Sequence, residues 1–373
     1  MAPGGRAASA GVPRRPSGYR VPVRALTVTP GQKSGAELVE YAEPSPDEGE
    51  VLVQTVAVGV CGTDREILAG EYGEAPPGED RLVLGHESLG RVLAAPDGSG
   101  LVEGDLVVGI VREPDPEPCG SCAVGEQDMC RNGRFTEHGI KGVHGFARDR
   151  YRADATALVA VPASLGLRGV LVEPASVLAK AWEHIEHIGR RGRWEPRTVL
   201  VTGAGPVGLL AALLGSQRGL EVHVADLVAD GPKPELVSRL GGTYHAGPVT
   251  DVPLAADVVL ECTGVPAVIA SVLSGTAMGG VVCLAGVSSP GRIDVDLGSL
   301  NREWVLQNDV VFGSANANRR HYEAAVQALT QADPAWLDDM ITRTTDVLSF
   351  AEALEERDDD IKSVLLFDPP PGA

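Results

Sequence analysis

An apolar run followed by three closely spaced glycines restricts most strongly how this chain can fold. The run Thr198–Thr202 precedes Gly203, Gly205 and Gly208, and a helix-like segment, Leu209–Leu214, follows directly. Gly203 allows a tight turn, Gly205 lets backbone N–H groups approach a pyrophosphate, and Gly208 lets the helix pack closely on the strand. Because the N-terminus of a helix favours anions, this order of strand, turn and helix predicts a dinucleotide site.

Further strand-like runs follow this turn at regular spacing. They are Glu221–Ala225, Val258–Cys262 and Gly280–Ala285, and helix-like segments separate them. Such alternation is typical of βαβ units, so we expect residues 186–313 to form a Rossmann-type, doubly wound parallel sheet in an α/β fold. The residues expected to contact the dinucleotide lie where these strands end: Gly203, Gly205, Pro206, Val207, Gly208, Asp226, Thr263, Gly264, Ala285 and Gly286.

Asp226 indicates which dinucleotide is preferred. It follows the second strand-like run, where a carboxylate can accept hydrogen bonds from both ribose hydroxyls of an adenosine and would repel a 2′-phosphate. The sequence therefore favours NAD. Three basic residues near Asp226 in the sequence keep NADP possible: Arg218, Lys233 and Arg239.

The residues before this predicted sheet follow a different sequence pattern. Short valine-rich runs, separated by Gly and Pro, occupy Val51–Val58, Leu89–Ala94 and Leu106–Val111. This pattern predicts a compact antiparallel β domain. We expect the domain to span residues 21–185, with a helix at Ala179–Ile188 leading out of it.

The two ends of the chain receive separate predictions. Residues 1–20 lack periodicity and are expected to form a disordered leader without a catalytic role. Near the other end, the helical Arg319–Thr330 and the apolar Ser363–Phe367 are expected to return to the first domain. Residues 314–373 would then complete that domain.

Composition excludes several classes of function. With 373 residues, 43% of them hydrophobic, the chain can bury two cores. A net charge of -19 would repel nucleic acid and anionic membrane surfaces. There is neither an apolar run of about 18 residues nor a secretory signal, which predicts a cytoplasmic protein without a membrane partner.

A cysteine, a histidine and a glutamate are candidate metal ligands. Cys61 follows a strand-like run, His86 lies in a Gly-His-Glu stretch, and Glu173 precedes the predicted helix. A thiolate, an imidazole and a carboxylate can hold Zn²⁺ and leave a fourth position open for water or substrate. Taken singly, the same residues are better explained as a small buried thiol, a hydrogen-bonded core histidine and a helix-start acid; taken together, with the dinucleotide motif downstream, they favour a metal site.

Together, the motifs resemble those of the zinc-dependent medium-chain dehydrogenases, in order and over nearly the whole chain. The matching stretches are Cys61-Gly-Thr-Asp64, Gly85-His-Glu87 with Gly90, Gly104-Asp105 with Val107-Val108, Glu173-Pro174 and the turn from Gly203 to Gly208. Three stretches are similar to the glucose dehydrogenase branch: Cys61 to Glu66, Arg134-Phe-Thr-Glu137 and Gly313-Ser-Ala-Asn316. The resemblance implies a GroES-like, partly open β-barrel catalytic domain joined to the Rossmann domain.

The resemblance also implies a catalytic zinc. The ion would be held by Cys61, His86 and either Glu173 or Glu87. It would polarise a substrate hydroxyl while hydride passes to the nicotinamide.

Proton transfer is implied at two further positions. Thr63 would bind the substrate oxygen and pass its proton outward, and Glu87 would exchange with water at the metal or relay protons. Many relatives have a histidine three residues beyond the threonine, where this chain has Glu66. The outer part of the proton path is therefore left open.

The same branch suggests how a sugar would be bound. Its members use a carboxylate and an amide for sugar hydroxyls, and Glu137 and Asn316 occupy the matching positions, with Thr63 nearby in the site. Without the resemblance, Glu137 would be read as a surface acid and Asn316 as a turn residue. The implied reaction is oxidation of an aldose, foremost D-glucose at C1 to the lactone. A polyol or secondary-alcohol dehydrogenase of the sorbitol or threonine type is the alternative, and a non-catalytic nucleotide-binding relative would be expected to have lost the metal ligands.

A group of cysteines resembles the structural-zinc lobe of this superfamily. Its members are Cys119, Cys122 and Cys130. The lobe normally supplies four cysteines, and the first would fall at Pro116. A carboxylate can complete a tetrahedral zinc site, so Asp115 is the expected fourth ligand and Glu117 the alternative. The competing interpretation is a lobe that holds free thiols and no metal.

Assembly is the last expectation. Strand-forming residues near Val281–Val287 and Val310–Phe312 can pair between subunits, as they do in the family. We therefore expect a homodimer or a homotetramer.

Overall fold

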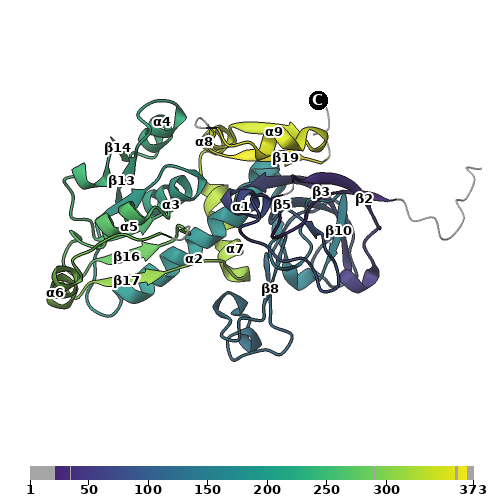
Figure 1. Cartoon of the computed structure of the whole chain (residues 1–373), viewed down its shortest axis with the longest axis horizontal. Helices are drawn as coiled ribbons and strands as arrows, with labels where there is room; N and C mark the ends of the chain where they lie inside the picture. The colour runs from purple at the N-terminus through teal and green to yellow at the C-terminus, as the bar shows by residue number, and fades with distance from the viewer. Residues whose placement is uncertain (1–21, 34, 289–290, 358–359, 368–373) are drawn as a thin grey trace, which may run out of the picture.

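A computed structural model of the chain describes residues 22–33, 35–288, 291–357 and 360–367. The predicted leader, residues 1–20, lies outside this part. Figure 1 shows two sheet-bearing parts on either side of the long helix α2 (Val172–Gly189). In the part of the chain that the structure describes, no helix is long and apolar enough to span a membrane.

The predicted parallel sheet has the strand order β14-β13-β12-β15-β16-β17. Its strands are β12 (Thr198–Thr202), β13 (Glu221–Asp226), β14 (Thr243–Ala246), β15 (Val258–Glu261), β16 (Val281–Leu284) and β17 (Val310–Gly313). Each predicted run therefore forms a strand, with small shifts at the ends. Because parallel strands end at one edge of a sheet, Gly203, Asp226 and Thr263 meet at that edge.

The glycine-rich turn has the geometry that its sequence requires. Gly203 has a φ of +83°, in the left-handed region that side chains disfavour. A Cβ atom on Gly208 would lie 1.8 Å from the carbonyl oxygen of Gly203, so only glycine allows the helix this close to the turn. Gly205 is the N-cap of helix α3 (Pro206–Gln217), whose first residue, Pro206, suits a position that needs no hydrogen-bonded N–H.

The N-terminal half forms a mainly antiparallel sheet that includes two strands from the end of the chain, and these two pair in parallel with each other. Its order is β11-β6-β5-β3-β19-β18, and β10 also pairs with β3. The strands are β3 (Val51–Val60), β5 (Glu87–Ala94), β6 (Leu106–Gly109), β10 (Arg150–Ala153), β11 (Leu158–Val161), β18 (Arg343–Asp346) and β19 (Ser363–Leu366). Ser363 pairs with Val60 in an antiparallel register, so the C-terminal segment lies within the N-terminal sheet.

Two small sheets and the remaining helices complete the described fold. The small sheets are ordered β2-β1-β4 and β7-β8-β9. Their strands are β1 (Val23–Val28), β2 (Glu37–Tyr41), β4 (Leu82–Val83), β7 (Arg112–Glu113), β8 (Thr136–His138) and β9 (Gly142–Val143). The other α-helices are α1 (Gly62–Leu68), α4 (Pro232–Arg239), α5 (Pro266–Val272), α6 (Leu297–Gln307), α7 (Arg319–Gln331), α8 (Pro334–Met340) and α9 (Phe350–Leu354).

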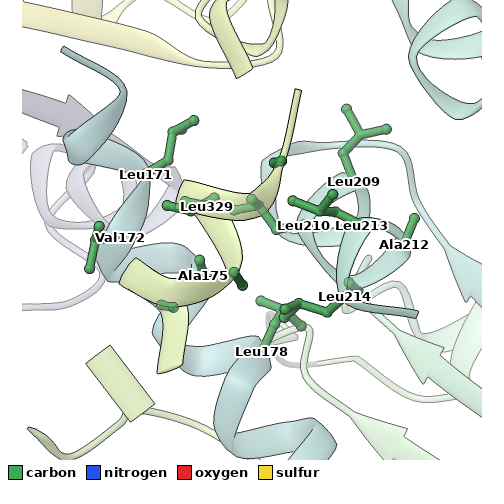
Figure 2. Packing of buried hydrophobic residues seen from close by; sticks show 14 of the residues in the cluster. Leu171, Val172, Ala175, Leu178, Leu209, Leu210, Ala212, Leu213, Leu214 and Leu329 are labelled. Carbon is green, nitrogen blue, oxygen red and sulfur yellow. The ribbon is translucent and has the colours of Figure 1, made fainter. Parts of the chain in front are cut away.

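Helix α2 joins the two parts through a shared apolar core. It begins at Val172, earlier than the predicted start at Ala179, because Pro174 falls in the first turn, where proline is tolerated. Figure 2 shows leucines of α2, α3 and α7 packed together, among them Leu178, Leu214 and Leu329. The helix also crosses residue 185, so the predicted domain boundary at that point stays a prediction.

Candidate active site

Cys61 and His86 lie side by side where β3 ends and β5 begins. Cys61 is the N-cap of α1, and its Sγ lies 2.9 Å from Nε2 of His86. The backbone N–H of Thr63 donates to the same sulfur over 3.2 Å. The helix start therefore fixes the direction of the thiol toward the imidazole.

Asp64 completes this group on the other side of the imidazole. One ligand atom from each of Cys61, Asp64 and His86 lies within 4.8 Å of the others. Asp64 accepts a hydrogen bond from the backbone N–H of Cys61 at 2.9 Å, and its second oxygen lies 3.5 Å from Nδ1 of His86. The histidine thus presents Nε2 to the thiol and Nδ1 to a carboxylate, an arrangement typical of metal-ligating histidines.

The electrostatics of this group favour a cation. Burial lowers the pKa of His86, but the charges of Cys61 and Asp64 raise it well above its usual value. The sulfur and nitrogen that face each other carry lone pairs that Zn²⁺ binds well. The residues present therefore fit a zinc ion.

The two predicted acidic ligands occupy different surroundings. Glu87 is buried and forms an ion pair with Lys362, whose ammonium also donates to the carbonyl of Val60 over 3.1 Å. Glu173 lies in the first turn of α2. Burial raises the pKa of Glu173 to about 7, which the positive charges of His86 and Lys362 oppose. Neither acid belongs to the close group of Cys61, Asp64 and His86, so the acidic ligand stays a prediction.

A cavity of about 460 Å³ opens beside Thr63 and contains all three predicted substrate residues. Its lining includes Thr63, Glu66, Glu71, Tyr72, Arg112, Phe135, Glu137, Ile140, Val287, Ser288, Ala315 and Asn316. The amide of Asn316 donates to Oε1 of Glu137 over 2.6 Å, and Arg112 donates to the same oxygen over 2.9 and 3.1 Å. The structure therefore brings together residues that are far apart in the sequence.

A second cavity, of about 390 Å³, lies at the edge of the parallel sheet. Gly203, Asp226 and Thr263 are among the residues that line it. Asp226 accepts hydrogen bonds from the backbone N–H groups of Ala204, at 2.6 Å, and Val228, at 2.9 Å. Its carboxylate is therefore fixed at the mouth of the cavity.

Other predicted dinucleotide residues lie just after β16 and in the first turn of α3. Ala285 and Gly286 follow β16 and donate from their backbone N–H groups to the carbonyl of Glu261. The next two residues in the chain, at positions 287 and 288, line the cavity beside Thr63. Pro206 and Val207 lie in the first turn of α3, next to the turn of the first strand.

Glu261 is a buried organiser of this edge that the sequence analysis missed. Its carboxylate accepts hydrogen bonds from the hydroxyl of Thr202, over 3.2 Å, and from the backbone N–H groups of Thr263 and Gly264, over 2.8 and 3.1 Å. Asp64, Arg112 and Lys362 were missed as well. Only Asp64 has a local signal, since it belongs to the Cys-Gly-Thr-Asp stretch; the others are single charged residues without a pattern.

The three clustered cysteines meet in the segment between β7 and β8, residues 114–135, which we name the cysteine lobe. Figure 1 shows it projecting from the body of the molecule next to β8. The sulfur atoms of Cys119, Cys122 and Cys130 all lie within 4.8 Å of one another. Hydrogen bonds from backbone N–H groups, that of Arg131 foremost, lower the pKa of Cys119 to about 6.

Asp115, the predicted fourth ligand, lies beside the lobe with partners of its own. It accepts from the backbone N–H of Glu117 at 2.8 Å and forms an ion pair with Arg134 at 3.4 Å. Its carboxylate is not part of the group of three thiols. The fourth ligand therefore stays a prediction.

Comparisons with known proteins agree with this geometry. Residues 47–163 match the family model of the alcohol dehydrogenase GroES-like domain, and residues 167–367 match that of the glucose dehydrogenase C-terminus. Glucose 1-dehydrogenase 2 of Vulcanisaeta moutnovskia is 40% identical, over 92% of this chain and 99% of that protein. Glucose 1-dehydrogenase of Thermoproteus tenax is 42% identical, over 92% of this chain and 99% of that protein.

A solved structure is similar over almost the whole chain. It is that of Haloferax mediterranei glucose dehydrogenase in complex with NADP, Zn and gluconolactone, with 34% identity and a TM-score of 0.87. The match covers 93% of this chain and 100% of that chain. The predicted fold, a GroES-like domain joined to a Rossmann-type parallel sheet, is confirmed. The chain belongs to the glucose dehydrogenase family of the zinc-dependent medium-chain dehydrogenases.

Proposed function

We propose that the protein oxidises an aldose, foremost D-glucose at C1, to the lactone, with transfer of hydride to NAD(P)⁺ and release of a proton. One observation carries this proposal. A single cavity is bordered by Thr63, next to the thiol and imidazole, by the polar pair Glu137 and Asn316, and by Val287 and Ser288 from the dinucleotide edge. The names of the relatives, glucose 1-dehydrogenases, support the same substrate.

The residues of the chain divide the work of this reaction. When bound, zinc supplies Lewis acidity toward a sugar hydroxyl, and the nicotinamide accepts hydride from the carbon that bears it. Cys61, His86 and Glu173 would hold the metal. Thr63 would hydrogen-bond the reacting hydroxyl and pass its proton toward Glu66 on the cavity wall.

The roles of the two acids follow from their partners. Lys362 neutralises Glu87 inside the protein, whereas Glu173 faces the positive charge of His86. We assign Glu173 as the third ligand, whereas Glu87 would exchange with water at the metal or relay protons. The cysteine lobe would hold a second, structural zinc through its three thiolates and Asp115.

Zinc content and activity test the two metal sites. Replacing Cys61 or His86 by Ala should remove one zinc per chain and lower glucose oxidation at least about a thousandfold, because the Lewis acid would be lost. Cys130→Ala should remove the other zinc and leave the chemistry intact. The measurements are metal analysis of purified protein and initial rates.

Cys283→Ala is the matched control for these variants. It removes a buried thiol of the parallel sheet that belongs to neither site, and should change neither zinc content nor rate. Full activity in Cys61→Ala would contradict the catalytic assignment. One zinc per wild-type chain, instead of two, would contradict the structural site.

We propose that NAD is preferred over NADP. The fixed carboxylate of Asp226 at the mouth of the sheet-edge cavity supports this preference, because it would repel a 2′-phosphate. Lys233 lies 3.5 Å from the carboxylate and weakens that repulsion without removing it. The solved structure of the Haloferax relative is a complex with NADP, so a member of the same family binds that coenzyme.

Removal of the negative charge of Asp226 should shift the coenzyme preference toward NADP. Asp226→Ser should raise the ratio of kcat/KM for NADP to that for NAD about tenfold to a hundredfold, because it removes a repulsion of about 1.4 to 2.8 kcal/mol that Lys233 already weakens. Glu235→Gln removes an exposed acid of α4 and serves as the control, with an unchanged ratio. A wild type that prefers NADP would refute the proposal.

The charges that line the cavity of about 460 Å³ beside Thr63, which we name the sugar cavity, favour one class of substrate. Glu66, Glu71 and Glu137 line it, and among its described lining residues Arg112 is the only basic one. Because Arg112 is committed to Glu137, an anionic substrate would meet uncompensated negative charge. The cavity therefore suits neutral sugars.

Initial rates with a panel of substrates test this preference. Glucose should be used with a kcat/KM at least about a hundredfold higher than glucose 6-phosphate, since a phosphate dianion near several carboxylates costs several kcal/mol. Asn316→Ala should lower kcat/KM for glucose about tenfold through the lost hydrogen bond. A clear preference for sorbitol would instead indicate a polyol dehydrogenase.

We propose a homodimer or homotetramer assembled through the edge of the parallel sheet. In the described strand order β17 has a neighbour on one side only, and several large apolar side chains nearby are exposed. They are Met278, Val287, Leu297, Val305 and Leu306. A sheet edge combined with an apolar surface is typical of subunit contacts.

Light scattering after size exclusion measures the assembly. The wild type should have a mass at least twice that of one chain, and Val305→Lys should shift it toward the monomer, because a buried ammonium disfavours an apolar contact. Leu348→Lys changes an exposed leucine just after β18, outside the parallel sheet, and should leave the mass unchanged. A monomeric wild type would refute the proposal.

We also propose that the protein resides in the cytoplasm. All six cysteines are free, in keeping with thiolates that bind metal in a reducing compartment. Detection of the protein in a membrane or secreted fraction of its cells would refute this location.

A further inference from the structure

A lysine is buried in the middle of α2, outside the metal site. The side chain of Lys180 is only 2% exposed, and its ammonium lies 2.8 Å from a carboxylate oxygen of Asp128 in the cysteine lobe. It also donates to the carbonyl of Asp128 at 3.4 Å and to that of Ala315 at 3.0 Å. One ammonium therefore ties two separate segments to α2.

Asp128 has two further hydrogen-bond partners besides Lys180. Its other carboxylate oxygen accepts a hydrogen bond from the amide of Asn318 at 2.8 Å, and its carbonyl accepts one from Arg112 at 3.1 Å. Each carboxylate oxygen of Asp128 therefore has its own partner inside the protein, Lys180 on one side and Asn318 on the other.

Both tied segments carry the polar wall of the sugar cavity. Arg112 donates a hydrogen bond to the carbonyl of Asp128 and forms an ion pair with Glu137. Ala315, held by Lys180, directly precedes Asn316, whose backbone has a φ of +63°. The two halves of the Glu137–Asn316 pair thus depend on one ammonium from opposite sides.

Stability alone does not account for such a pair. Removing two charges from water costs about as much as their attraction returns, so apolar residues of similar size are often equally stable. A second connection, in which Arg320 pairs with Glu183 of α2 and with Glu126 of the lobe, already joins the same segments at the surface. What the buried pair adds is a fixed position for Arg112 and for the segment of Ala315 relative to α2.

We infer that the Lys180–Asp128 pair is a positioning element that sets the spacing of Glu137 and Asn316 and thereby the affinity for the sugar. The inference rests on the proposed function of the cavity. It goes beyond that function because neither residue lines the cavity. The pair acts on the sugar only through Arg112 and the segment of Ala315.

Asp128→Asn tests the inference with the least change in shape. The amide keeps the size of the side chain and its contact with Asn318, but loses the charge that holds Lys180. The KM for glucose should rise about tenfold, while kcat, the KM for NAD and the zinc content change less than about twofold. Amide hydrogen exchange should accelerate in residues 110–113, which Asp128 holds through Arg112, and in residues 314–317, which Lys180 holds through Ala315.

A remote ion pair provides the matched control. Glu43→Gln breaks the pair of Glu43 with Arg150, whose atoms lie 2.6 Å apart on the N-terminal sheet. This variant should leave the KM for glucose and the exchange of both segments as in the wild type. If both variants lose thermal stability but neither changes the KM for glucose, the positioning role is overturned.

A second variant covers the case in which Asp128→Asn does not fold. The double substitution Lys180→Met with Asp128→Leu removes both charges together and leaves neither one unpaired. It should fold and show the same rise in KM, and an unchanged KM would overturn the inference. If the wild type oxidises a different polyol, the proposed function fails, and the same comparison with that polyol decides the positioning role.

Discussion

The packing of α2 between the two sheets is the constraint on which the site depends. Its first turn holds Glu173 beside His86, and Lys180 lies two turns further on, about 10 Å along the axis at 1.5 Å per residue. Trp182, still deeper in the helix, donates its indole N–H to the carbonyl of Ala211 in α3, over 3.3 Å. One helix therefore carries a candidate metal ligand, the lysine that holds the segment of Asn316, and a tryptophan that contacts the helix after the glycine-rich turn.

Buried charges connect this helix to the rest of the molecule. Glu87 is paired with Lys362, the residue just before the last strand, and Asp128 is paired with Lys180. Glu261 instead relies on neutral donors from the loops at the strand ends. A buried charge without partners is costly, so each such group makes one segment depend on another that is distant in sequence. The site can therefore assemble only when both sheets and the C-terminal strand are in place.

The sequence predicted what is encoded by local pattern. Strand runs such as Thr198–Thr202 and the glycines of the following turn reveal themselves by periodicity and spacing, and the structure has them at the same positions. Glu137 and Asn316 were found through short stretches that resemble a known family, and they share one cavity. The charge partners were not predicted. A lone lysine such as Lys180 or Lys362 is read as a surface residue, since only the tertiary fold supplies the acid that lets it be buried.

The direct hydrogen bond between Asn316 and Glu137 shows why these remote partners matter for a sugar. A sugar hydroxyl is both donor and acceptor, so it can replace that one bond by two, one to the carboxylate and one from the amide. The exchange is favourable only if the carboxylate and the amide stay in place while the hydroxyl enters. Arg112 fixes the carboxylate, and the segment held by Lys180 carries the amide. Recognition of a neutral sugar would therefore depend on Lys180 and Asp128, two charged residues that do not line the cavity.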